Sequence, residues 1–361
     1  MTPLSYCTNV HPAEDLAGVL GQLDSYALPV RERLGADRLG LGLWLAADVA
    51  SALAADPGER KRLRAELDAR GLEVVTFNAF PYGGFHDPVV KQKVYRPRWT
   101  DRARAEYTLN CATVLSGLLP DDAAFGSIST LPLGWREPWT PEDDAAAQRL
   151  LDEVTAGLRA QDRTIRLAVE PEPGCILDTV HDAVSWLAGR VDPAHVGLCL
   201  DTCHLAVSFA DPAGAVAEIT AAGLDVVKVQ MSAALHVPDP RDPAAREALA
   251  AFDEPRYLHQ TRESSGGDVR KADDLGEAFA DLPGEGPWRV HFHVPLHATP
   301  AAPLSSTTEV LSQALAALPP KPAHLEVETY TWTVLPEAHR QDLIGGIAAE
   351  LSFAAGLVAS K

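Results

Sequence analysis

The sequence predicts an α/β protein built as a (β/α)8 TIM barrel, in which eight parallel strands alternate with helices. Two observations support this prediction. Short apolar runs typical of strands alternate with segments of helical spacing along nearly the whole chain. Several of these runs end in carboxylate, imidazole or amide side chains, and such barrels carry their active sites at the carboxyl ends of their strands. The length of 361 residues fits one domain, residues 1–361, with an extended connection.

Nine runs have the composition expected of strands. Their approximate ranges are 4–10, 39–45, 72–80, 125–133, 165–169, 196–201, 224–231, 288–296 and 324–332. A barrel of this type has eight strands, so one run is in excess. We assign the run 288–296 to an insertion of about residues 233–300 between the seventh and eighth barrel strands. The stretch 232–287 is polar and rich in proline, and we expect it to be irregular, as long functional loops are.

Helical segments are expected between these runs, at about 14–34, 46–70, 100–118, 140–163, 180–187, 212–222, 304–318 and 336–358. The clearest helix start is the sequence Thr140-Pro141-Glu142-Asp143. Threonine is a good N-cap, proline suits the first helical position, and acidic residues favour the first turn. Gly71 and Gly223 mark the ends of two of these helices.

Charge and composition narrow the classes of partner. The formal net charge is −19, which opposes binding to a phosphate backbone, so we expect no nucleic-acid partner. The five cysteines form no CxxC pair, which favours a reduced, cytoplasmic protein. No signal peptide and no run long enough to span a membrane is evident. We therefore expect a small-molecule substrate, and a homo-oligomer is compatible with the sequence.

Polar side chains gather where the later strand-like runs end. They are Glu170 and Glu172, Asp201 and His204, Lys228 and Gln230, Glu326 and Glu328, and His291 and His293 in the excess run. Side chains two apart on a strand share a face, so each strand pair can point inward together. Carboxylates crowded in one place repel each other, and a divalent cation removes that conflict. Oxygen-rich sites with one or two imidazoles suit Mn²⁺, Mg²⁺ or Co²⁺, whereas more nitrogen favours Zn²⁺.

Each of these residues also has a purely structural interpretation. Asp201 is placed to cap a helix, and His204 is placed to pack within one. The acidic residues around Pro171 suit an exposed turn. Gln230 is an amide, and buried amides are more often hydrogen-bonding groups than metal ligands. What favours the metal site is that acidic residues end three separate apolar runs, where unpaired charges are rare.

The order of the motifs RLAVEPEPG, CLDTCHLA, VKVQMS and LEVET resembles the xylose isomerase-like barrel superfamily. That group includes sugar isomerases, ketose 3-epimerases, inosose dehydratases and the apurinic-site endonucleases. The resemblance implies one metal ion held at the positions Glu170, Asp201, Gln230 and Glu328, with His204 as a second-shell or substrate-contacting residue. Gln230 departs from the family, which has histidine there, and His293 or His291 is placed to compensate.

A closer resemblance concerns the motifs SYCTNVHP, FNAFPYGGFH and HLEVETYTW, which are similar to those of the EboE metabolite-traffic proteins, themselves sugar-isomerase-like barrels. It covers nearly the whole chain and fixes no substrate. Taken with the strand-end residues, it indicates metal-dependent isomerisation or epimerisation of a small sugar- or cyclitol-like compound through an enediolate.

We expect Glu170, Glu328 and His204 to be catalytic, the two glutamates as the acid/base pair. The substrate-binding residues expected are Glu172, His204, Lys228, His259, His291, Asn78, Trp44, Trp135 and Glu326. Two other functions stay open. One is metal-dependent hydrolysis like that of the apurinic-site endonucleases, which use a trinuclear Zn²⁺ cluster and extra histidines. The other is a non-catalytic barrel that carries a metabolite within a pathway.

Overall fold

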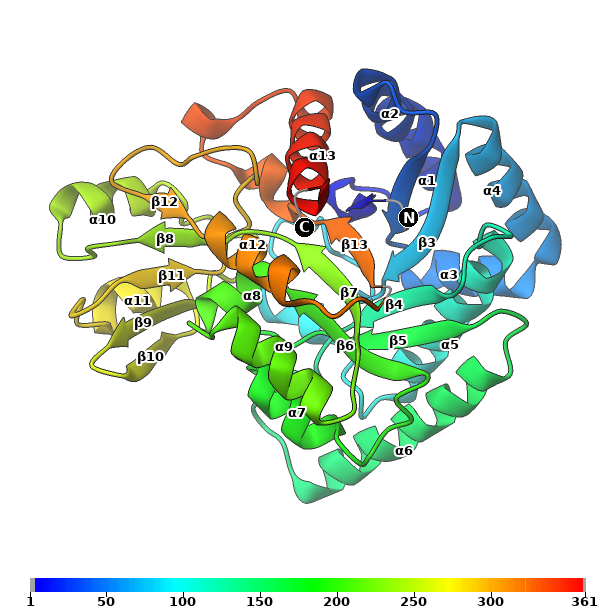
Figure 1. The fold of residues 1–361 in the computed structure, drawn as a ribbon, viewed down its shortest axis with the longest axis horizontal. Coiled ribbons are helices and arrows are strands. Elements are labelled where there is room, and N and C mark those ends of the chain that lie inside the picture. Colours follow the sequence, from blue (N-terminus) through cyan, green and yellow to red (C-terminus); the bar gives the residue numbers. More distant parts are fainter. Residues whose placement is uncertain (1–3, 322, 360–361) are drawn as a thin grey trace.

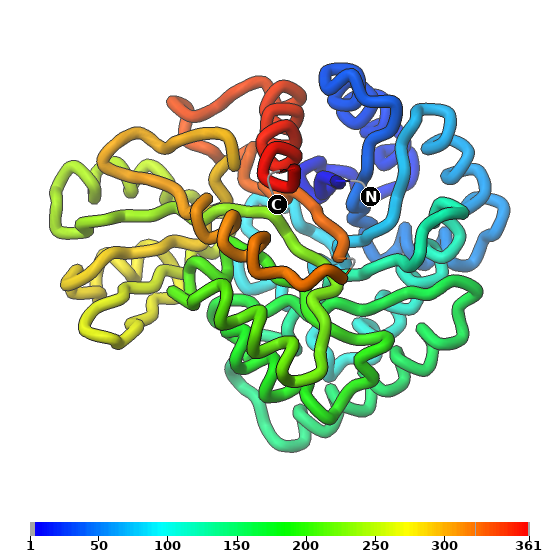
Figure 2. Tube along the Cα trace, viewed as in Figure 1, coloured from blue at the N-terminus to red at the C-terminus, as the bar shows by residue number. Residues whose placement is uncertain are grey.

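Eight parallel strands close into a barrel in the order β1-β13-β7-β6-β5-β4-β3-β2 in the computed structural model, which describes residues 4–321 and 323–359 (Figure 1). The barrel strands are β1 (Ser5–Cys7), β2 (Leu39–Leu43), β3 (Leu72–Asn78), β4 (Gly126–Thr130), β5 (Ile165–Val169), β6 (Val196–Asp201), β7 (Val226–Met231) and β13 (His324–Val327). The first strand pairs with both β2 and the last strand β13, which closes the ring (Figure 2). The predicted TIM barrel is confirmed.

Helices surround the barrel and follow its strands along the chain (Figure 1). They are α1 (Leu16–Gln22), α2 (Leu28–Leu34), α3 (Ala47–Ala55), α4 (Pro57–Ala69), α5 (Arg102–Leu118), α6 (Pro141–Arg159), α7 (Val180–Leu187), α8 (Thr202–Val207), α9 (Pro212–Ala221), α12 (Thr308–Ala317) and α13 (Leu343–Ala359). A short π-helix, Leu23–Ala27, joins α1 to α2. The predicted start of α6 is confirmed, because the Thr140 hydroxyl accepts from the Asp143 backbone N–H.

The barrel strands are buried on both faces, as parallel strands covered by helices must be. Every residue of β2, β6 and β7 is buried. A buried ion pair joins the neighbouring strands β7 and β13, where Lys228 Nζ lies 2.8 Å from Glu326 Oε1. The Glu326 carboxylate fits only because position 42 is glycine: a Cβ on Gly42 would lie 1.2 Å from Glu326 Oε2.

Between β7 and β13 the chain forms a second sheet, which is antiparallel and lies beside the barrel at the left of Figure 1. Its strands, in the order β10-β9-β11-β8-β12, are β8 (Leu235–Val237), β9 (Thr261–Ser265), β10 (Asp268–Ala272), β11 (Trp288–Val290) and β12 (Ser305–Ser306). Helices α10 (Pro243–Ala250) and α11 (Leu275–Asp281) belong to the same part of the chain.

Two expectations for this part of the chain were wrong. Residues 232–287 are not irregular, because they form strands that pair with one another. Of these strands, β10 has no apolar pattern to reveal it, since four of its five residues are exposed. The strand expected at 288–296 stops at Val290, so His291 and His293 lie in the segment that follows it.

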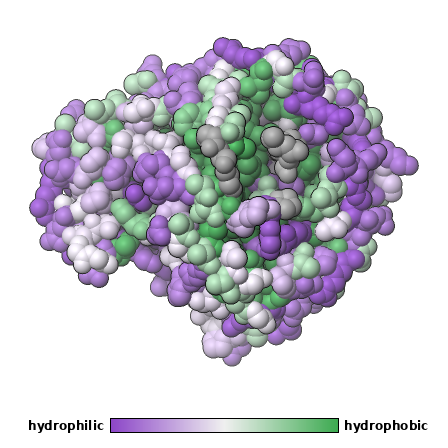
Figure 3. All heavy atoms as spheres, viewed as in Figure 1, coloured by the Kyte–Doolittle hydropathy of each residue, from purple (hydrophilic) through white to green (hydrophobic). Residues whose placement is uncertain are grey.

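Hydrophilic residues cover most of the periphery in the view of Figure 3, and apolar residues gather nearer the centre. Within residues 4–321 and 323–359, no helix has the length and apolarity needed to cross a lipid bilayer.

Candidate metal centre

Three carboxylates meet at the carboxyl ends of the strands. Glu170 directly follows β5, Asp201 is the last residue of β6, and Glu328 directly follows β13. One oxygen from each lies within 4.8 Å of the others, and all three side chains are buried. Barrel closure therefore unites groups that are 158 positions apart in the sequence, at the end where such barrels hold their active sites.

Asp201 combines a structural and a functional position. Its Oδ1 accepts from the His204 backbone N–H at 2.9 Å, which caps α8, and from the Ser232 hydroxyl at 2.8 Å. Its Oδ2 is buried and has no hydrogen-bond partner among the described residues. The helix cap and the metal site, which the sequence left as alternatives, use different oxygens of the same carboxylate.

Glu328 is held by three amide groups. Its Oε1 accepts from Asn9 Nδ2 at 2.7 Å and from Asn78 Nδ2 at 2.8 Å, and its Oε2 accepts from Gln230 Nε2 at 2.5 Å. The Gln230 oxygen accepts instead from the Cys199 thiol at 3.4 Å. In this arrangement Gln230 orients a carboxylate of the site, and its own oxygen points at a thiol.

Position 230, where the resemblance leads us to expect a histidine, is a glutamine in this chain, but His293 places an imidazole close to the carboxylates. Its Nδ1 lies 2.8 Å from the backbone oxygen of Glu328, and because a carbonyl only accepts, Nδ1 carries the hydrogen. The lone pair of neutral His293 is therefore on Nε2, which lies 3.9 Å from Asp201 Oδ2. A histidine whose other ring nitrogen donates to a carbonyl is oriented as metal-ligating histidines are.

The donor set fits a divalent cation. Glu170 Oε2, Asp201 Oδ2 and His293 Nε2 are buried and have no hydrogen-bond partner among the described residues. Leaving such acceptors buried and unpaired is costly, and a cation beside Asp201 Oδ2, which lies 3.9 Å from His293 Nε2 and in the carboxylate cluster of Glu170, would relieve that cost. Three carboxylates with one imidazole suit Mn²⁺, Mg²⁺, Co²⁺ or Zn²⁺.

The same crowding shifts the titration of the glutamates. Burial, together with the charge of Glu328, raises the pKa of Glu170 well above its usual range. Burial, together with the charge of Asp201, raises the pKa of Glu328 to about 8. A bound cation would favour the ionised forms and reverse both shifts.

A second group of ligand-type side chains adjoins the first. His204 Nε2 lies 3.0 Å from Glu172 Oε2 and 3.1 Å from His291 Nε2. Both rings donate from Nδ1, His204 to the backbone oxygen of Pro171 and His291 to Gln260 Oε1, each at 2.8 Å. The Nε2 lone pairs of His204 and His291 therefore face each other beside the Glu172 carboxylate. Such a contact between acceptors requires a proton on one of these groups or a cation between them.

The pKa directions agree with a proton on His204. Burial alone would lower the pKa of His204, but the carboxylates of Asp201 and Glu172 outweigh it and raise this pKa well above its usual range. Burial and the neighbouring His204 lower the pKa of His291 well below its usual range.

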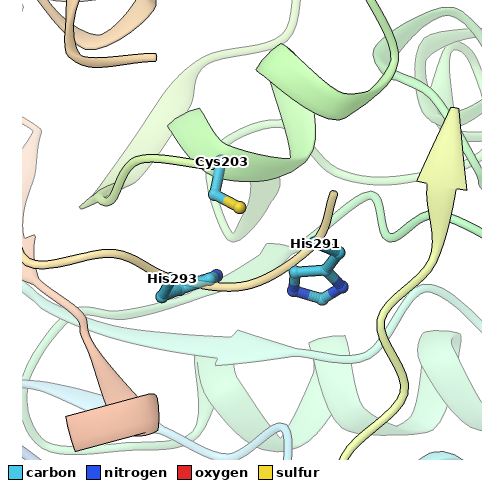
Figure 4. Close-up of side chains that lie close together, drawn as sticks. All are labelled: Cys203, His291 and His293. Atoms are coloured by element: carbon cyan, nitrogen blue, oxygen red, sulfur yellow. The ribbon is translucent and has the colours of Figure 1, made fainter. Parts of the chain in front are cut away.

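Cys203, on α8, points toward the segment that carries His291 and His293 (Figure 4). One ligand atom from each of these three residues lies within 4.8 Å of the other two.

A cavity opens above these groups. It is lined by Asn9, Asn78, Phe80, Pro81, Phe85, Lys91, Val94, Tyr95, Glu170, Glu172, His204, Tyr257, Leu258, His291, His293, Glu328 and Tyr330. Four of the residues expected to bind substrate therefore line the cavity: Asn78, Glu172, His204 and His291.

The other expected substrate-binding residues lie outside that lining. Lys228 and Glu326 form the ion pair inside the barrel. His259 is fully buried and supports His291 through the backbone, with its Nδ1 3.1 Å from the His291 oxygen. Trp44 is packed behind Phe85 with its indole N–H bonded to a backbone carbonyl, and Trp135 lies against Tyr95 at a ring-centroid distance of 5.1 Å.

Several residues at the site were not found from the sequence. Asn9 lies at the end of the first predicted strand, where its position was a usable signal. The aromatic walls Phe85, Tyr95, Tyr257 and Tyr330 come from connecting segments, which have no periodicity to mark them. Glu350 of α13 is buried and accepts from the Leu296 backbone N–H, the Thr329 hydroxyl and the Trp332 indole N–H. It thereby ties together the segments that carry His293 and Glu328.

Solved structures share the fold of this chain. A xylose isomerase-like TIM barrel protein from Mycobacterium smegmatis, in complex with magnesium, superposes with a TM-score of 0.56 at 14% identity, covering 100% of this chain and 97% of that one. An L-ribulose 3-epimerase gives a TM-score of 0.55 at 12% identity, covering 100% and 95%. The IOLI protein with a bound zinc atom gives 0.52 at 13% identity, covering 100% and 99%.

None of the curated proteins matches the sequence. The sequence profile of a family described as xylose isomerase-like TIM barrel matches residues 32–257, which is well over half of the chain and includes Glu170 and Asp201. With the closed barrel and the strand-end carboxylates in place, this match shows that the chain belongs to the xylose isomerase-like TIM barrel family.

Proposed function

We propose that the protein is a divalent-metal-dependent isomerase or epimerase of a small sugar- or cyclitol-like hydroxy-carbonyl compound. The observation that carries this proposal is the cluster of three buried carboxylates, Glu170, Asp201 and Glu328. The unpaired Nε2 of His293 lies 3.9 Å from Asp201 Oδ2, and Glu170, Glu328 and His293 line the cavity. The similarity of the fold to an L-ribulose 3-epimerase, and to relatives solved with magnesium and zinc, supports it.

Glu170, Asp201, His293 and Glu328 would hold the metal ion, and Gln230 would act by orienting Glu328. A divalent cation bound there supplies Lewis-acid stabilisation of the negative charge that develops on a carbonyl and its neighbouring hydroxyl. Asn9 and Asn78 fix the position of Glu328 from the opposite side, so that its carboxylate keeps one orientation during the reaction.

Glu170 and Glu328 come from barrel strands on different sides of Asp201 and suit the two proton-transfer roles. One carboxylate removes the proton from the carbon that carries the hydroxyl next to the carbonyl, and the electron pair moves onto the carbonyl oxygen to give an enediolate. The other glutamate returns a proton to the same carbon from the opposite face, which epimerises it. Return to the former carbonyl carbon instead gives the isomer. No oxidant or reductant is needed.

His204 and Glu172 also line the cavity and are suited to binding substrate hydroxyls. The imidazolium form of His204 can donate a hydrogen bond to the oxygen of a substrate hydroxyl, and the Glu172 carboxylate can accept one from the same hydroxyl. His204 thereby belongs to the reacting part of the site.

Metal content and proton exchange test the proposal. The wild-type protein should bind about one divalent ion per chain, and it should catalyse deuterium exchange from D₂O into the carbon next to the carbonyl of a substrate. Glu328→Gln should lose metal affinity and exchange. Glu337→Gln, which removes the same charge at an exposed position, is the matched control. Unchanged metal content in Glu328→Gln would contradict the assignment.

One observation favours a second candidate, a metal-dependent hydrolase. The group Glu172, His204 and His291 has the ligand types of a further cation site beside the first. Multinuclear sites of this kind activate water for hydrolysis. Mass spectrometry of the native protein distinguishes the two: one ion per chain supports the isomerase, and two or three ions with phosphodiester cleavage support the hydrolase.

A role in handling a pathway metabolite is supported by the resemblance to the EboE metabolite-traffic proteins. All five cysteines are free and buried, which agrees with a reducing compartment such as the cytoplasm. Proton exchange separates catalysis from transport, because a carrier would bind a metabolite without exchanging its protons.

A further inference from the structure

The cavity above the metal centre is divided into a polar floor and an apolar wall. The floor is formed by the carboxylates, imidazoles and amides of Asn9, Asn78, Glu170, Glu172, His204, His291, His293 and Glu328, and the wall by the rings and alkyl groups of Phe80, Pro81, Phe85, Val94, Tyr95, Tyr257, Leu258 and Tyr330. A substrate with hydroxyl groups along its whole length would need polar partners on the wall as well as on the floor.

The hydroxyl groups of two wall tyrosines are already committed to the protein. Tyr95 donates to Glu172 Oε1 and accepts from Gln260 Nε2, both at 2.8 Å. Tyr257 donates to the backbone oxygen of Phe85 at 3.2 Å. These tyrosines therefore offer their ring faces to a ligand, as Phe85 does, and aromatic faces suit apolar groups.

The fully buried side-chain polar atoms that have no hydrogen-bond partner among the described lining residues all belong to the floor. They are Asn9 Oδ1, Glu170 Oε2 and His293 Nε2. Even Asn78 is committed, because its Nδ2 donates to Glu328 and its Oδ1 accepts from the Phe80 backbone N–H. A substrate hydroxyl placed against the wall would lose its water partners without gaining protein partners, which is costly.

The charges of the lining disfavour a phosphate group. Three carboxylates, Glu170, Glu172 and Glu328, face the cavity, and Lys91 is the one lysine or arginine among its lining residues. The Lys91 ammonium is already paired with Asp274, which also caps α11. A phosphate would therefore meet a negative floor and a neutralised cation.

Resting on the proposed isomerase function, we propose that the substrate is an uncharged hydroxy-carbonyl compound with a compact polar head and an apolar body. The head is the carbonyl with its neighbouring hydroxyl and lies on the floor. The body lies against the wall that Phe85 and Tyr257 form, whose rings pack together at a centroid distance of 5.2 Å.

The test compares three probes that share a hydroxy-carbonyl group: 2-hydroxyacetophenone, D-fructose and D-fructose 6-phosphate. Proton NMR in D₂O follows exchange of the hydrogens on the hydroxyl-bearing carbon next to the carbonyl, with the metal-loaded protein and with metal alone as the blank. We expect kcat/KM for 2-hydroxyacetophenone to exceed that for fructose by about tenfold or more, which equals about 1.4 kcal/mol, and fructose 6-phosphate to be the poorest. Equal or better exchange of either sugar would overturn the substrate class and leave the isomerase function standing.

Measurements of ligand binding separate a failure of the isomerase proposal from a failure of the proposed substrate class. If no probe exchanges although the metal is bound, the isomerase function is wrong, and titration calorimetry then decides the substrate class alone. Tighter binding of 2-hydroxyacetophenone than of fructose supports an amphipathic ligand, and equal or weaker binding overturns it.

A wall substitution provides an independent check. Leu258→Asn places an amide of similar size on the half-buried wall, so the preference for 2-hydroxyacetophenone over fructose should fall by about tenfold, about 1.4 kcal/mol. The matched control is Leu34→Asn on the outer helix α2, which is also half-buried. An unchanged preference in Leu258→Asn would contradict the proposed position of the apolar body.

Discussion

The imidazole of His293 donates its Nδ1 hydrogen to the backbone carbonyl of Glu328 at 2.8 Å, so one residue of the candidate metal centre orients another. The two residues come from separate segments, one following β11 and the other following β13. The bond fixes the tautomer of His293 and directs its Nε2 lone pair toward Asp201.

The first prediction follows from this bond. His293→Ala removes the imidazole ligand and should weaken metal binding by more than about 100-fold, whereas Gln230→Ala removes a group that only orients Glu328 and should cost about 10- to 100-fold. Titration calorimetry with Mn²⁺ and Zn²⁺ measures both. A larger loss in Gln230→Ala would make Gln230 the fourth ligand.

Asp201 separates metal binding from folding. Asparagine caps helices about as well as aspartate, so Asp201→Asn should change the free energy of unfolding of the metal-free protein by less than about 1 kcal/mol and still abolish metal binding. Asp211→Asn, at the exposed cap of α9, is the matched control and should keep the metal. Urea denaturation and metal analysis of the two variants provide the comparison, and a metal-binding Asp201→Asn protein would refute the assignment.

The elevated pKa values predict how stability depends on pH. In the metal-free protein the pKa of Glu328 is raised to about 8 by burial and neighbouring carboxylates, whereas an unfolded glutamate titrates near about 4.3. Between these values the folded state binds more protons than the unfolded chain, so the free energy of unfolding falls as pH rises from about 4.3 to 8. The Tm of the metal-free protein should therefore decrease over this window.

Metal binding should reverse that trend, because the cation replaces the bound proton. The increase in Tm on adding Mn²⁺ should be larger at pH 8 than at pH 5.5, and binding at pH 7 should release protons into a weakly buffered solution. Scanning calorimetry and calorimetric titration in buffers of different ionisation enthalpy measure the two effects. A pH-independent increase in Tm would contradict the elevated pKa of Glu328.

The buried ion pair of Lys228 and Glu326 gives a prediction on stability. Lys228→Met leaves a fully buried carboxylate without its partner and should cost about 3–5 kcal/mol of unfolding free energy. The double variant Lys228→Met/Glu326→Leu removes both charges and should recover much of that loss, since apolar replacements of buried pairs are often tolerated. Urea unfolding of the three proteins measures the coupling, and additive losses would argue against a direct interaction.

The barrel and the carboxylate centre were predictable from the sequence for the same physical reason. Buried parallel strands must be continuously apolar, so an acidic residue at the end of such a run, like Glu170 or Asp201, is conspicuous. The strand β10 was not predictable, because four of its five side chains are exposed and leave no apolar pattern. Its pairing with β9 depends on backbone hydrogen bonds, which every sequence can make.

The role of His293 was open in the sequence because its position depended on where a strand ended. Predicted on a strand, it would share a face with His291; in the structure both follow the end of β11 at Val290. The choice between His293 and Gln230 is indicated by two hydrogen bonds, from His293 to a carbonyl and from Gln230 to Glu328. Neither bond has a local sequence signature, because each joins segments that only the closed barrel brings together.

The contact between Gly42 and Glu326 also restricts which residues relatives of this protein can carry at these positions. A Cβ at position 42 would lie 1.2 Å from the Glu326 carboxylate, and that carboxylate in turn neutralises Lys228. We therefore expect the three positions, which lie on β2, β13 and β7, to change together among relatives. In an alignment of relatives, a larger residue at position 42 should occur only together with the loss of the acid at 326 and of the base at 228.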